Sequence, residues 1–534
     1  MKVIIVGGVA GGATAAARIR RLDEHAEITV FERSGYISYA NCGLPYYIGD
    51  VITDPEELTL QTPESFFKRF RINMKIHHEV ISIHPERKTV SVKNLENGEI
   101  FEENYDKLIL SPGAKPTQPR LPGVGMDKLF TLRTVEDTFR IKEYINKNHP
   151  KSAVLAGGGF IGLELAENLR ELGMDVTIVQ RPKQLMNPFD PDMASMIHNE
   201  MRKHGIKLVL GYTVEGFKEK DNGVEVLLKD NPSLQADMVV LAIGVTPDTA
   251  LAKEAGLELG IKGSIVVNDR METSVPDIYA AGDAVQVKHY VTGDDALISL
   301  AGPANKQGRI IADNICGGDS RYLGSQGSSV IKVFDMTAAT TGINETNAKK
   351  SGLEVDTVIL SPMSHAGYYP GGKVMTMKVV FEKETYRLLG AQIIGYEGVD
   401  KRIDVLATAI HAGLKATQLK DLDLAYAPPY SSAKDPVNMA GFMIDNIAKG
   451  TLKQWHLEDM DKISKDKSVV LLDVRTVGEF NRGHMDGFRN IPVDELRERI
   501  NEIEKGKPVY LICQSGLRSY IASRILEGNG YETY

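Results

Sequence analysis

The hydrophobic pattern at the start of the chain predicts a strand, a turn, a helix and a second strand. Residues 3–6 form an uninterrupted apolar run, and residues 7–12 contain four glycines. Residues 13–22 have apolar positions at helical spacing, and residues 28–31 are apolar again. Short apolar runs bounded by glycine are typical of buried strands in a parallel sheet. The segment therefore predicts a βαβ unit, and its glycines interrupt the apolar stretch that a signal peptide needs.

The glycine turn and the acid that follows it predict a dinucleotide site, although an ordinary strand–turn–helix has the same pattern. Glycine lets the backbone approach a pyrophosphate, and an acid about 20 residues further on accepts a ribose hydroxyl. Glu32 lies 20 residues after Gly12, whereas Val9 occupies the usual middle glycine position. The cofactor-binding candidates of this unit are Gly7, Gly8, Gly11, Gly12, Glu32 and Arg33.

The same pattern recurs 150 residues later, which predicts a second dinucleotide in one chain. Residues 153–156 form an apolar run, residues 157–162 are a complete GxGxxG, and residues 163–172 have helical spacing. The next apolar run ends at Gln180, where an acid favours NAD, and Arg181 follows, where an arginine suits a 2′-phosphate. NADH and NADPH both remain open, with a slight preference for NADH. The candidates here are Gly157, Gly159, Gly162 and Gln180.

Composition narrows the class of protein. The 534 residues predict about three to five domains. Lysine and arginine number 63 against 71 acids, so a net charge of −8 argues against a general nucleic-acid binder. No apolar run approaches the roughly 18 residues of a membrane span. Three scattered cysteines, without a CxxC, predict neither a disulfide framework nor a metal site, and make the cytoplasm the expected location.

Three further segments carry a family resemblance. Residues 108–114 and 239–247 are apolar strands that run into glycine, and residues 275–283 end in Gly282-Asp283. With the two βαβ units, they resemble the pyridine nucleotide–disulfide oxidoreductases over about residues 1–447. The resemblance implies FAD, with Asp283 at its ribityl chain, and NAD(P)H. It also implies domains at 1–145 and 249–324 (FAD), 146–248 (NAD(P)H) and 325–447 (dimerisation, α+β).

Cys42 is the candidate redox residue of these domains. Dithiol members of the family carry a second cysteine five positions later, where this chain has Tyr47. A lone thiol has to cycle through a mixed disulfide, a persulfide or a sulfenate. Near a helix N-terminus and a flavin, we expect Cys42 to have a lowered pKa. A buried structural cysteine is the alternative.

Longer motifs resemble the coenzyme A-disulfide reductases. They are Asn41-Cys42 and residues 367–371 and 425–431, which contain Tyr368 and Tyr426. The resemblance implies that these two tyrosines come from the partner subunit of a homodimer and act near the substrate and flavin. Related peroxidases and oxidases carry a histidine where this chain has Ala10.

Coenzyme A, if bound, needs partners for its phosphates. Arg18 and Arg21 lie one helical turn apart and can reach one anionic group together, although a solvated face is the usual role of such a pair. Other positions match the family's ligand residues by resemblance. They are Thr14, Ser38, Asn41, Asn305 and Lys434.

The last 80 residues, 455–534, change character after a linker at 448–454. Apolar strands at 468–475 and 508–512 are followed by Cys513, three small or polar residues and Leu517-Arg518, then a helix expected from Tyr520. This stretch resembles a single α/β rhodanese domain. A strand-to-helix loop aims N–H groups at one point, and Arg518 with the helix dipole favours a Cys513 thiolate or persulfide. His484 is expected to be structural. Relatives continue beyond the position of Tyr534, so we expect a shortened domain or an incomplete chain.

Together the motifs predict an α/β flavoenzyme with two Rossmann-like domains, a dimerisation domain and a rhodanese domain. Its predicted reaction is NAD(P)H-dependent reduction of coenzyme A persulfide, coenzyme A disulfide or polysulfide at Cys42, with sulfane sulfur delivered by Cys513. Two alternatives remain open: an NADH oxidase or peroxidase, and a flavin-binding sulfur carrier or redox sensor without appreciable turnover.

Overall fold

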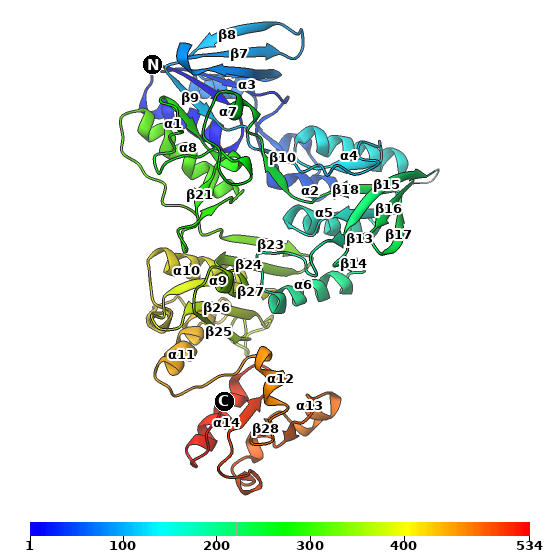
Figure 1. Cartoon of the computed structure of the whole chain (residues 1–534), viewed down its shortest axis with the longest axis vertical. Helices are drawn as coiled ribbons and strands as arrows, with labels where there is room; N and C mark the ends of the chain where they lie inside the picture. Colours follow the sequence, from blue (N-terminus) through cyan, green and yellow to red (C-terminus); the bar gives the residue numbers. More distant parts are fainter. Residues whose placement is uncertain (221–222) are drawn as a thin grey trace. The chain divides into compact units, whose positions relative to one another are not determined.

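The computed structural model describes residues 1–220 and 223–534 and separates into two compact units, Met1–Asp335 and Met336–Tyr534. Figure 1 shows the course of the chain from the N-terminus to the C-terminus. Within these described residues, every helix is too short or too polar to cross a membrane.

Unit 1 contains a five-stranded parallel sheet built from the apolar runs of the first βαβ unit. Its strand order is β20-β9-β1-β2-β5, so a strand from far along the chain pairs with β9 and completes the sheet. Helices α1 (Ala10–Leu22) and α8 (Ala301–Ile315) pack against each other beside it (Figure 1). The strands are β1 (Lys2–Val6), β2 (Glu27–Phe31), β5 (Asn73–Lys75), β9 (Lys107–Leu110) and β20 (Ile278–Ala280).

A second parallel sheet in unit 1 repeats this design, with the order β11-β18-β12-β13-β14. Each parallel sheet is accompanied by a three-stranded antiparallel sheet, β6-β7-β8 in the first half and β15-β16-β17 in the second. The second set comprises β11 (Leu129–Thr131), α4 (Val135–Asn148), β12 (Ser152–Ala156), α5 (Phe160–Glu171), β13 (Asp175–Gln180), α6 (Pro191–Lys203), β14 (Lys207–Leu210) and β18 (Met238–Leu241).

Shorter elements connect these sheets. The antiparallel strands are β6 (His78–His84), β7 (Thr89–Asn94), β8 (Ile100–Asn104), β15 (Val214–Lys220), β16 (Gly223–Leu228) and β17 (Asn231–Ala236). The connectors include β3 (Ile37–Tyr39), α2 (Leu44–Ile48), β4 (Thr59–Gln61), α3 (Pro63–Phe70), β10 (Ala114–Pro116), β19 (Val245–Pro247), α7 (Ala250–Glu254), β21 (Val287–Lys288), β22 (Asp295–Ala296) and β23 (Ser329–Val333).

Unit 2 begins with antiparallel strands in the order β24-β27-β26-β25. Strand β27 is buried along its whole length, because it lies in the middle of this group and α10 packs on it. The elements are β24 (Met336–Gly342), α9 (Glu345–Lys350), β25 (Val355–Leu360), β26 (Thr376–Glu382), β27 (Leu388–Gly395), α10 (Val399–His411) and α11 (Pro436–Ala448).

The C-terminal part of unit 2 is a small parallel sheet, β29-β28-β30, with its own apolar core. Residues at the end of the chain add to this sheet, since the backbone N–H of Tyr534 donates a hydrogen bond to the carbonyl of Val509 at 2.9 Å. The elements are α12 (Met460–Ile463), β28 (Val470–Asp473), α13 (Val477–Arg482), β29 (Arg489–Asn490), β30 (Val509–Ile512) and α14 (Leu517–Glu527).

The predicted fold class is confirmed, and Gly173 follows α5 in the left-handed region, with φ +88°, as a residue closing a helix does. Three helix starts were predicted too late. The helices α1, α5 and α14 each begin three residues earlier, at Ala10, Phe160 and Leu517. Glycine-rich sequence indicates a turn, yet in these cases the residues after the turn already have helical hydrogen bonds. Arg518 therefore lies in the first turn of α14 and not in the preceding loop.

A cluster of side chains attaches the C-terminal part of unit 2 to the antiparallel strands. Asp356 of β25 accepts hydrogen bonds from Gln454 Nε2 and His456 Nε2, both at 3.0 Å. Trp455, the only tryptophan, donates its indole N–H to the carbonyl of Leu511 at 3.0 Å. The hydrogen bond to Asp356 raises the pKa of His456, although partial burial opposes this shift.

This attachment is predicted to weaken as the pH rises. Because the pKa of His456 is raised, its stabilising contribution is fully present below about pH 6.5 and is lost as the pH rises through the raised pKa. We expect the emission of Trp455 to shift to the red over that range as the indole becomes more hydrated. His456→Gln should abolish the pH dependence, and His484→Gln, an exposed histidine of the same part, should not. An unchanged titration in His456→Gln would contradict this assignment.

Candidate active site

Two glycine turns, one in each half of unit 1, occupy equivalent places after the first strand of each βαβ unit. Gly7 has φ +96° and Gly157 has φ +120°, both in the left-handed region. A Cβ atom at Gly7 would overlap the carbonyl oxygen of Ser111, and one at Gly157 would overlap that of Ala242. Only glycine fits either position.

The two turns share a second contact that the sequence did not reveal. The carboxylate of Glu32 accepts a hydrogen bond from Gly8 N–H at 2.8 Å, and the side-chain oxygen of Gln180 accepts one from Gly158 N–H at 3.0 Å. Both predicted ribose-binding residues therefore also hold their turn against the end of the second strand. The amide of Gln180 makes this bond without adding a charge.

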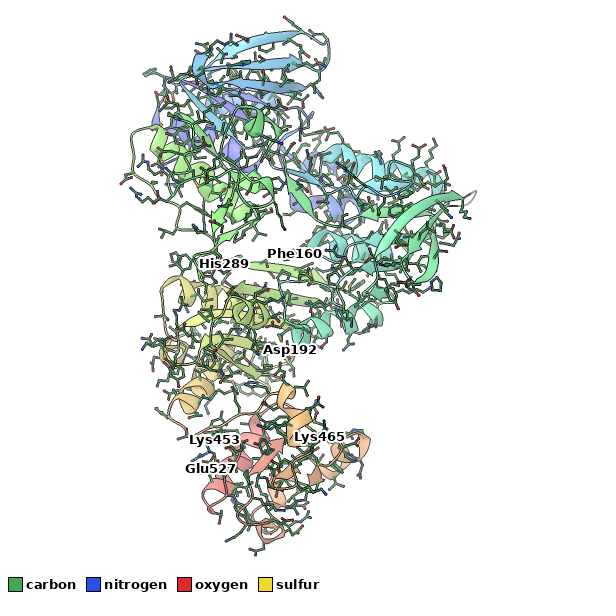
Figure 2. The ribbon with its side chains drawn as sticks, viewed as in Figure 1. Phe160, Asp192, His289, Lys453, Lys465 and Glu527 are labelled. Atoms are coloured by element: carbon green, nitrogen blue, oxygen red, sulfur yellow. The ribbon has the colours of Figure 1, made fainter. Side chains whose placement is uncertain are left out.

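The two turns fit the dinucleotides predicted for them. No side chain caps the N-terminus of α1 or α5 in this structure, so their first N–H groups remain available for a phosphate. Asp283 lies just after β20 and pairs with Arg133, 2.7 Å from Nη2 to Oδ2. Arg33 points to Asp248, with 2.8 Å between Nη2 and Oδ2. Figure 2 shows Phe160 as the first residue of α5, beside the second turn.

Cys42 lies in a short 3₁₀ turn, Asn41–Gly43, immediately before α2. The preceding strand β3 is attached to the first glycine turn, because Ser38 N–H donates to the carbonyl of Gly8 at 2.9 Å. Cys42 is exposed and free, which excludes the alternative of a buried structural cysteine. Tyr47, at the second-cysteine position of dithiol relatives, packs edge-on against Phe139 with ring centroids 5.7 Å apart.

The chain's own groups raise the pKa of Cys42, in the direction opposite to the lowering expected beside a helix N-terminus and a flavin. Partial desolvation raises the pKa of the thiol, the carboxylate of Glu164 adds to the rise, and Arg133 opposes it. The following helix α2 has only five residues, so its N-terminus adds little positive potential. Sequence reasoning missed Glu164 and Arg133 because each becomes a neighbour of Cys42 only through the packing of distant segments.

Glu164 is itself perturbed. Burial in α5, with the nearby charge of Glu167, raises the pKa of Glu164 to about 7. Glu167 is engaged, since it accepts from the backbone N–H of Phe334 at 2.7 Å and forms an ion pair with Lys332. Burial and Glu164 also raise the pKa of Tyr46 to about 12. The surroundings of Cys42 on this side thus favour neutral groups.

The predicted coenzyme A ligands are partly brought together. Thr14 on α1 donates its hydroxyl to Asn305 Oδ1 on α8 at 2.6 Å. Arg18 forms an ion pair with Asp313, at 2.8 Å from Nε to Oδ1, whereas Arg21 is exposed. Arg18 thus joins α1 to α8 in this structure, and the joint action of the two arginines on one anion stays a prediction.

Unit 2 carries two of the predicted catalytic residues in contact with each other. The hydroxyl oxygens of Tyr368 and Tyr426 are 2.8 Å apart, and both side chains are exposed, 76% and 46% respectively. The hydrogen bond to Tyr368 raises the pKa of Tyr426. Lys434, a predicted coenzyme A ligand, is exposed in the loop between Tyr426 and α11.

The second candidate thiol, Cys513, lies where β30 runs into α14. Gly516 N–H points at its sulfur, 3.1 Å from N to Sγ, as a strand-to-helix anion loop requires. Arg518 is held by a bidentate ion pair with Glu479, whose two oxygens lie 2.7 and 2.8 Å from its guanidinium. Glu479 also completes a capping box with Thr476. The T-x-x-E spacing of this capping box was visible in the sequence, whereas the ion pair between Glu479 and Arg518 was not.

His484 is stacked on Phe480, with ring centroids 3.8 Å apart, and its Nδ1 lies 3.1 Å from the Phe480 carbonyl. This geometry agrees with the structural role expected of His484.

In residues 1–220 and 223–534, no three His, Cys, Asp or Glu side chains come together as a metal site. A cavity of about 640 Å³ lies between α4 and residues 118–131, and neither candidate cysteine lines it.

Comparisons with known families match the chain in three stretches. Residues 1–308 match the pyridine nucleotide-disulphide oxidoreductase model. Residues 328–436 match the dimerisation domain of the same family, and residues 456–534 match the rhodanese-like domain.

Individual relatives agree with these matches. A coenzyme A disulfide reductase of Staphylococcus aureus (strain JH9) is 39% identical over 443 residues, which are 83% of this chain and 99% of the relative. The crystal structure of reduced CoADR-RHD from Bacillus anthracis is 48% identical, with a TM-score of 0.97 over 100% of this chain and 95% of that one. A NAD-dependent persulfide reductase from A. fulgidus is 38% identical, with a TM-score of 0.94 over 100% and 98%.

The charges around Cys42 predict opposite effects for two substitutions. Glu164→Gln removes a carboxylate that raises the pKa of the thiol, and Arg133→Met removes a cation that lowers it. At pH 8.5, alkylation of Cys42 by iodoacetamide should become about two- to fivefold faster in the first variant and slower by a similar factor in the second. The rate is read from the Cys42 peptide by mass spectrometry. Glu171→Gln, at the exposed end of α5, should leave it unchanged, and the reverse order of rates would refute the assignment.

Proposed function

The chain belongs to the pyridine nucleotide-disulphide oxidoreductase family, and we propose that its FAD-dependent reaction is the reduction of coenzyme A persulfide, coenzyme A disulfide or a related polysulfide by NAD(P)H at Cys42. For the persulfide, the balanced reaction is CoA-S-SH + NAD(P)H + H⁺ → CoA-SH + H₂S + NAD(P)⁺. For the disulfide, the products are two CoA-SH and NAD(P)⁺.

One observation carries this proposal: a single exposed thiol follows the strand that is bonded to the first glycine turn, with Tyr47 in place of a second cysteine. Such a thiol has no intramolecular partner and has to take its second sulfur from the substrate. The two alternatives are less favoured. A peroxidase or oxidase of this family carries a histidine where this chain has Ala10, and a carrier or sensor needs no intact second dinucleotide turn.

The chemistry at Cys42 begins with the attack of its thiolate on an S–S bond. Attack on the outer sulfur of coenzyme A persulfide forms a Cys42 persulfide and releases coenzyme A thiolate. Attack on the inner sulfur forms a mixed disulfide and releases hydrosulfide. In the first order, two electrons and a proton then release the outer sulfur of the Cys42 persulfide as H₂S and restore the Cys42 thiolate. In the second order, they release coenzyme A from the mixed disulfide and restore the same thiolate. Because the surrounding residues raise the pKa of the Cys42 thiol, the thiolate has to be stabilised by groups bound at the site.

The cofactors are assigned to the two turns. The residues that would hold FAD at the first turn are Gly7, Gly8, Gly11, Gly12, Glu32, Arg33 and Asp283. Those that would hold NAD(P)H at the second turn are Gly157, Gly159, Gly162 and Gln180. When bound, the flavin passes the electrons of NAD(P)H to sulfur. The uncharged Gln180 does not repel a 2′-phosphate as an acid does, and the preference for NADH is accordingly slight. Thr14, Arg21, Ser38, Asn41, Asn305 and Lys434 are assigned to coenzyme A, and Arg18 supports them from its pair with Asp313.

Proton delivery is assigned to the tyrosine pair. The hydroxyls of Tyr368 and Tyr426 are hydrogen-bonded and exposed, so one phenol can donate to a leaving thiolate while the other supports it. The dimerisation domain supports a homodimer, and we assign this tyrosine pair to the site of the partner's Cys42. Three free cysteines suit the reducing cytoplasm, which we take as the location.

Cys513 is assigned to the supply of sulfur. The N–H of Gly516 and the Glu479-held guanidinium of Arg518 stabilise a negatively charged sulfur at the end of β30. A persulfide on Cys513 can pass its outer sulfur to the thiol of coenzyme A, and the resulting coenzyme A persulfide is the substrate at Cys42. Covalent fusion of the two sites raises the local concentration of this intermediate.

Cys42→Ser is predicted to remove reductase activity. We expect turnover of coenzyme A persulfide, coenzyme A disulfide and polysulfide, each measured with NADH and with NADPH, to fall by at least about 10³-fold, as when a nucleophile is lost. Cys316→Ser is the matched control and should retain full activity. Persulfide reduction that survives in Cys42→Ser would overturn the proposed function.

Cys513→Ser is predicted to separate the two activities. Sulfur transfer from thiosulfate to a thiol should fall to background, because the acceptor sulfur is missing. NAD(P)H-dependent reduction of coenzyme A disulfide should stay within about twofold of the unsubstituted enzyme, since Cys42 is untouched. An equal loss of both activities would contradict this division of labour.

A further inference from the structure

A buried arginine of α10 lies beneath the exposed tyrosine pair. Arg402 is only 1% exposed, and its Nη2 lies 3.0–3.2 Å from four acceptors, which share its two N–H groups. These are the carbonyls of Ser364 and Tyr430, the hydroxyl of Ser431 and the carboxylate of Asp435. A single guanidinium nitrogen thus contacts two separate stretches of chain.

The charge of this arginine is balanced by Asp435. The carboxylate is 3% exposed, and its Oδ2 lies 3.1 Å from Nη2 and accepts the hydroxyl of Ser431 at 2.7 Å. Its Oδ1 accepts from the backbone N–H of Val437 in the first turn of α11. A buried ion pair with several hydrogen bonds resists displacement, because either partner left alone is an uncompensated charge.

The two stretches that Arg402 contacts are the loops that carry the tyrosines. Ser364 precedes Tyr368 by four residues, and Ser431 follows Tyr426 by five. The loops also bond to each other directly, since Ala366 N–H donates to the carbonyl of Ser431 at 3.0 Å. The 2.8 Å contact between the two phenols is therefore the outer end of a network whose inner end is Arg402.

The start of α10 is shaped to admit the guanidinium. Gly398 has φ +67°, its carbonyl accepts from Arg402 Nη1 at 3.1 Å, and a Cβ at this position would overlap that nitrogen. A guanidinium presents several donors in one plane, whereas an ammonium offers a single point of charge. Arg402 bonds the Gly398 carbonyl through Nη1 and the two loops through Nη2, and the single nitrogen of a lysine cannot occupy both places.

We propose that Arg402 is a positioning residue that locks the two loops together, so that the hydroxyls of Tyr368 and Tyr426 stay hydrogen-bonded and deliver a proton as one unit. The use of that proton rests on the proposed function. The locking of the pair does not, because it depends only on contacts within unit 2.

The locking is tested in the full-length protein by placing 3-fluorotyrosine at position 426 alone and following its ¹⁹F signal against pH. The bond to Tyr368 raises the pKa of Tyr426, so Tyr368→Phe should lower its titration midpoint by about half a pH unit or more. Arg402→Met should lower it by a similar amount, and Arg402→Lys by less. The proposal would be overturned if residue 426 had the same titration midpoint in Arg402→Met as in the unsubstituted protein, or if Tyr368→Phe left that midpoint unchanged.

Two variants separate positioning from a general loss of stability. Lys378→Met breaks another buried ion pair of unit 2, with Glu345 on α9, and should lower the melting temperature without moving the ¹⁹F midpoint. Should Arg402→Met not fold, Ser431→Ala removes one hydroxyl of the network and should still shift the midpoint in the same direction. A shift in Lys378→Met as large as that in Arg402→Met would refute a specific role.

Activity supplies an independent arm. Arg402→Met should reduce kcat for coenzyme A disulfide about tenfold but cause no further loss when added to Tyr368→Phe/Tyr426→Phe, because it acts through that pair. A further loss in that background would count against the proposal. If the unsubstituted protein reduces none of the three sulfur substrates, the proposed function fails, and the ¹⁹F titrations still decide whether Arg402 locks the loops.

Discussion

At the turn after β1, the backbone of Gly7 passes so close to the carbonyl of Ser111 that no Cβ fits between them. This contact fixes the first glycine turn, to which two further segments of unit 1 are bonded. Gly8 of the same turn binds Glu32 at the end of β2, and its carbonyl binds the strand that leads to Cys42. The turn that we propose for a pyrophosphate is thus bonded to the strand that precedes the candidate redox thiol, and the second half of the unit repeats the turn around Gly157.

The two sulfur sites use opposite electrostatics. Cys513 has an N–H group directed at its sulfur and a nearby arginine held in place by Glu479, so its loop suits a persulfide anion. At Cys42, partial desolvation and the nearby carboxylate of Glu164 both disfavour the thiolate, so the surrounding residues favour the neutral thiol. This difference suits a division in which Cys513 stores activated sulfur and Cys42 reacts only when substrate and cofactor are present.

Unit 2 carries the residues of two proposed functions. Its antiparallel strands build a rigid support, and the loops after β25 and before α11 present the two phenols on its surface. The same unit carries the C-terminal sulfur-transfer part through the contacts of Gln454, Trp455 and His456. The proposed sites of proton delivery and sulfur supply therefore belong to one unit, although they lie in separate domain families.

The sequence by itself determined both βαβ units, and it identified Cys42 and the loop after Cys513 as the candidate sulfur sites. These features depend on local spacing, because a glycine turn, a strand of apolar residues and a cysteine between strand and helix are each contained in a short stretch of chain. Helix starts were misplaced by three residues because glycine indicates a turn even where the backbone already winds.

Only the tertiary structure decided which charges meet. Glu164 reaches the surroundings of Cys42, Glu479 takes hold of Arg518, Arg18 turns to Asp313, and Arg402 lies under two loops. Each of these contacts joins residues that are distant in the chain, and no local pattern encodes it. Electrostatic effects depend on distance and burial in three dimensions, so the sequence determined the chemistry available to this protein, and packing decided its acidity and orientation.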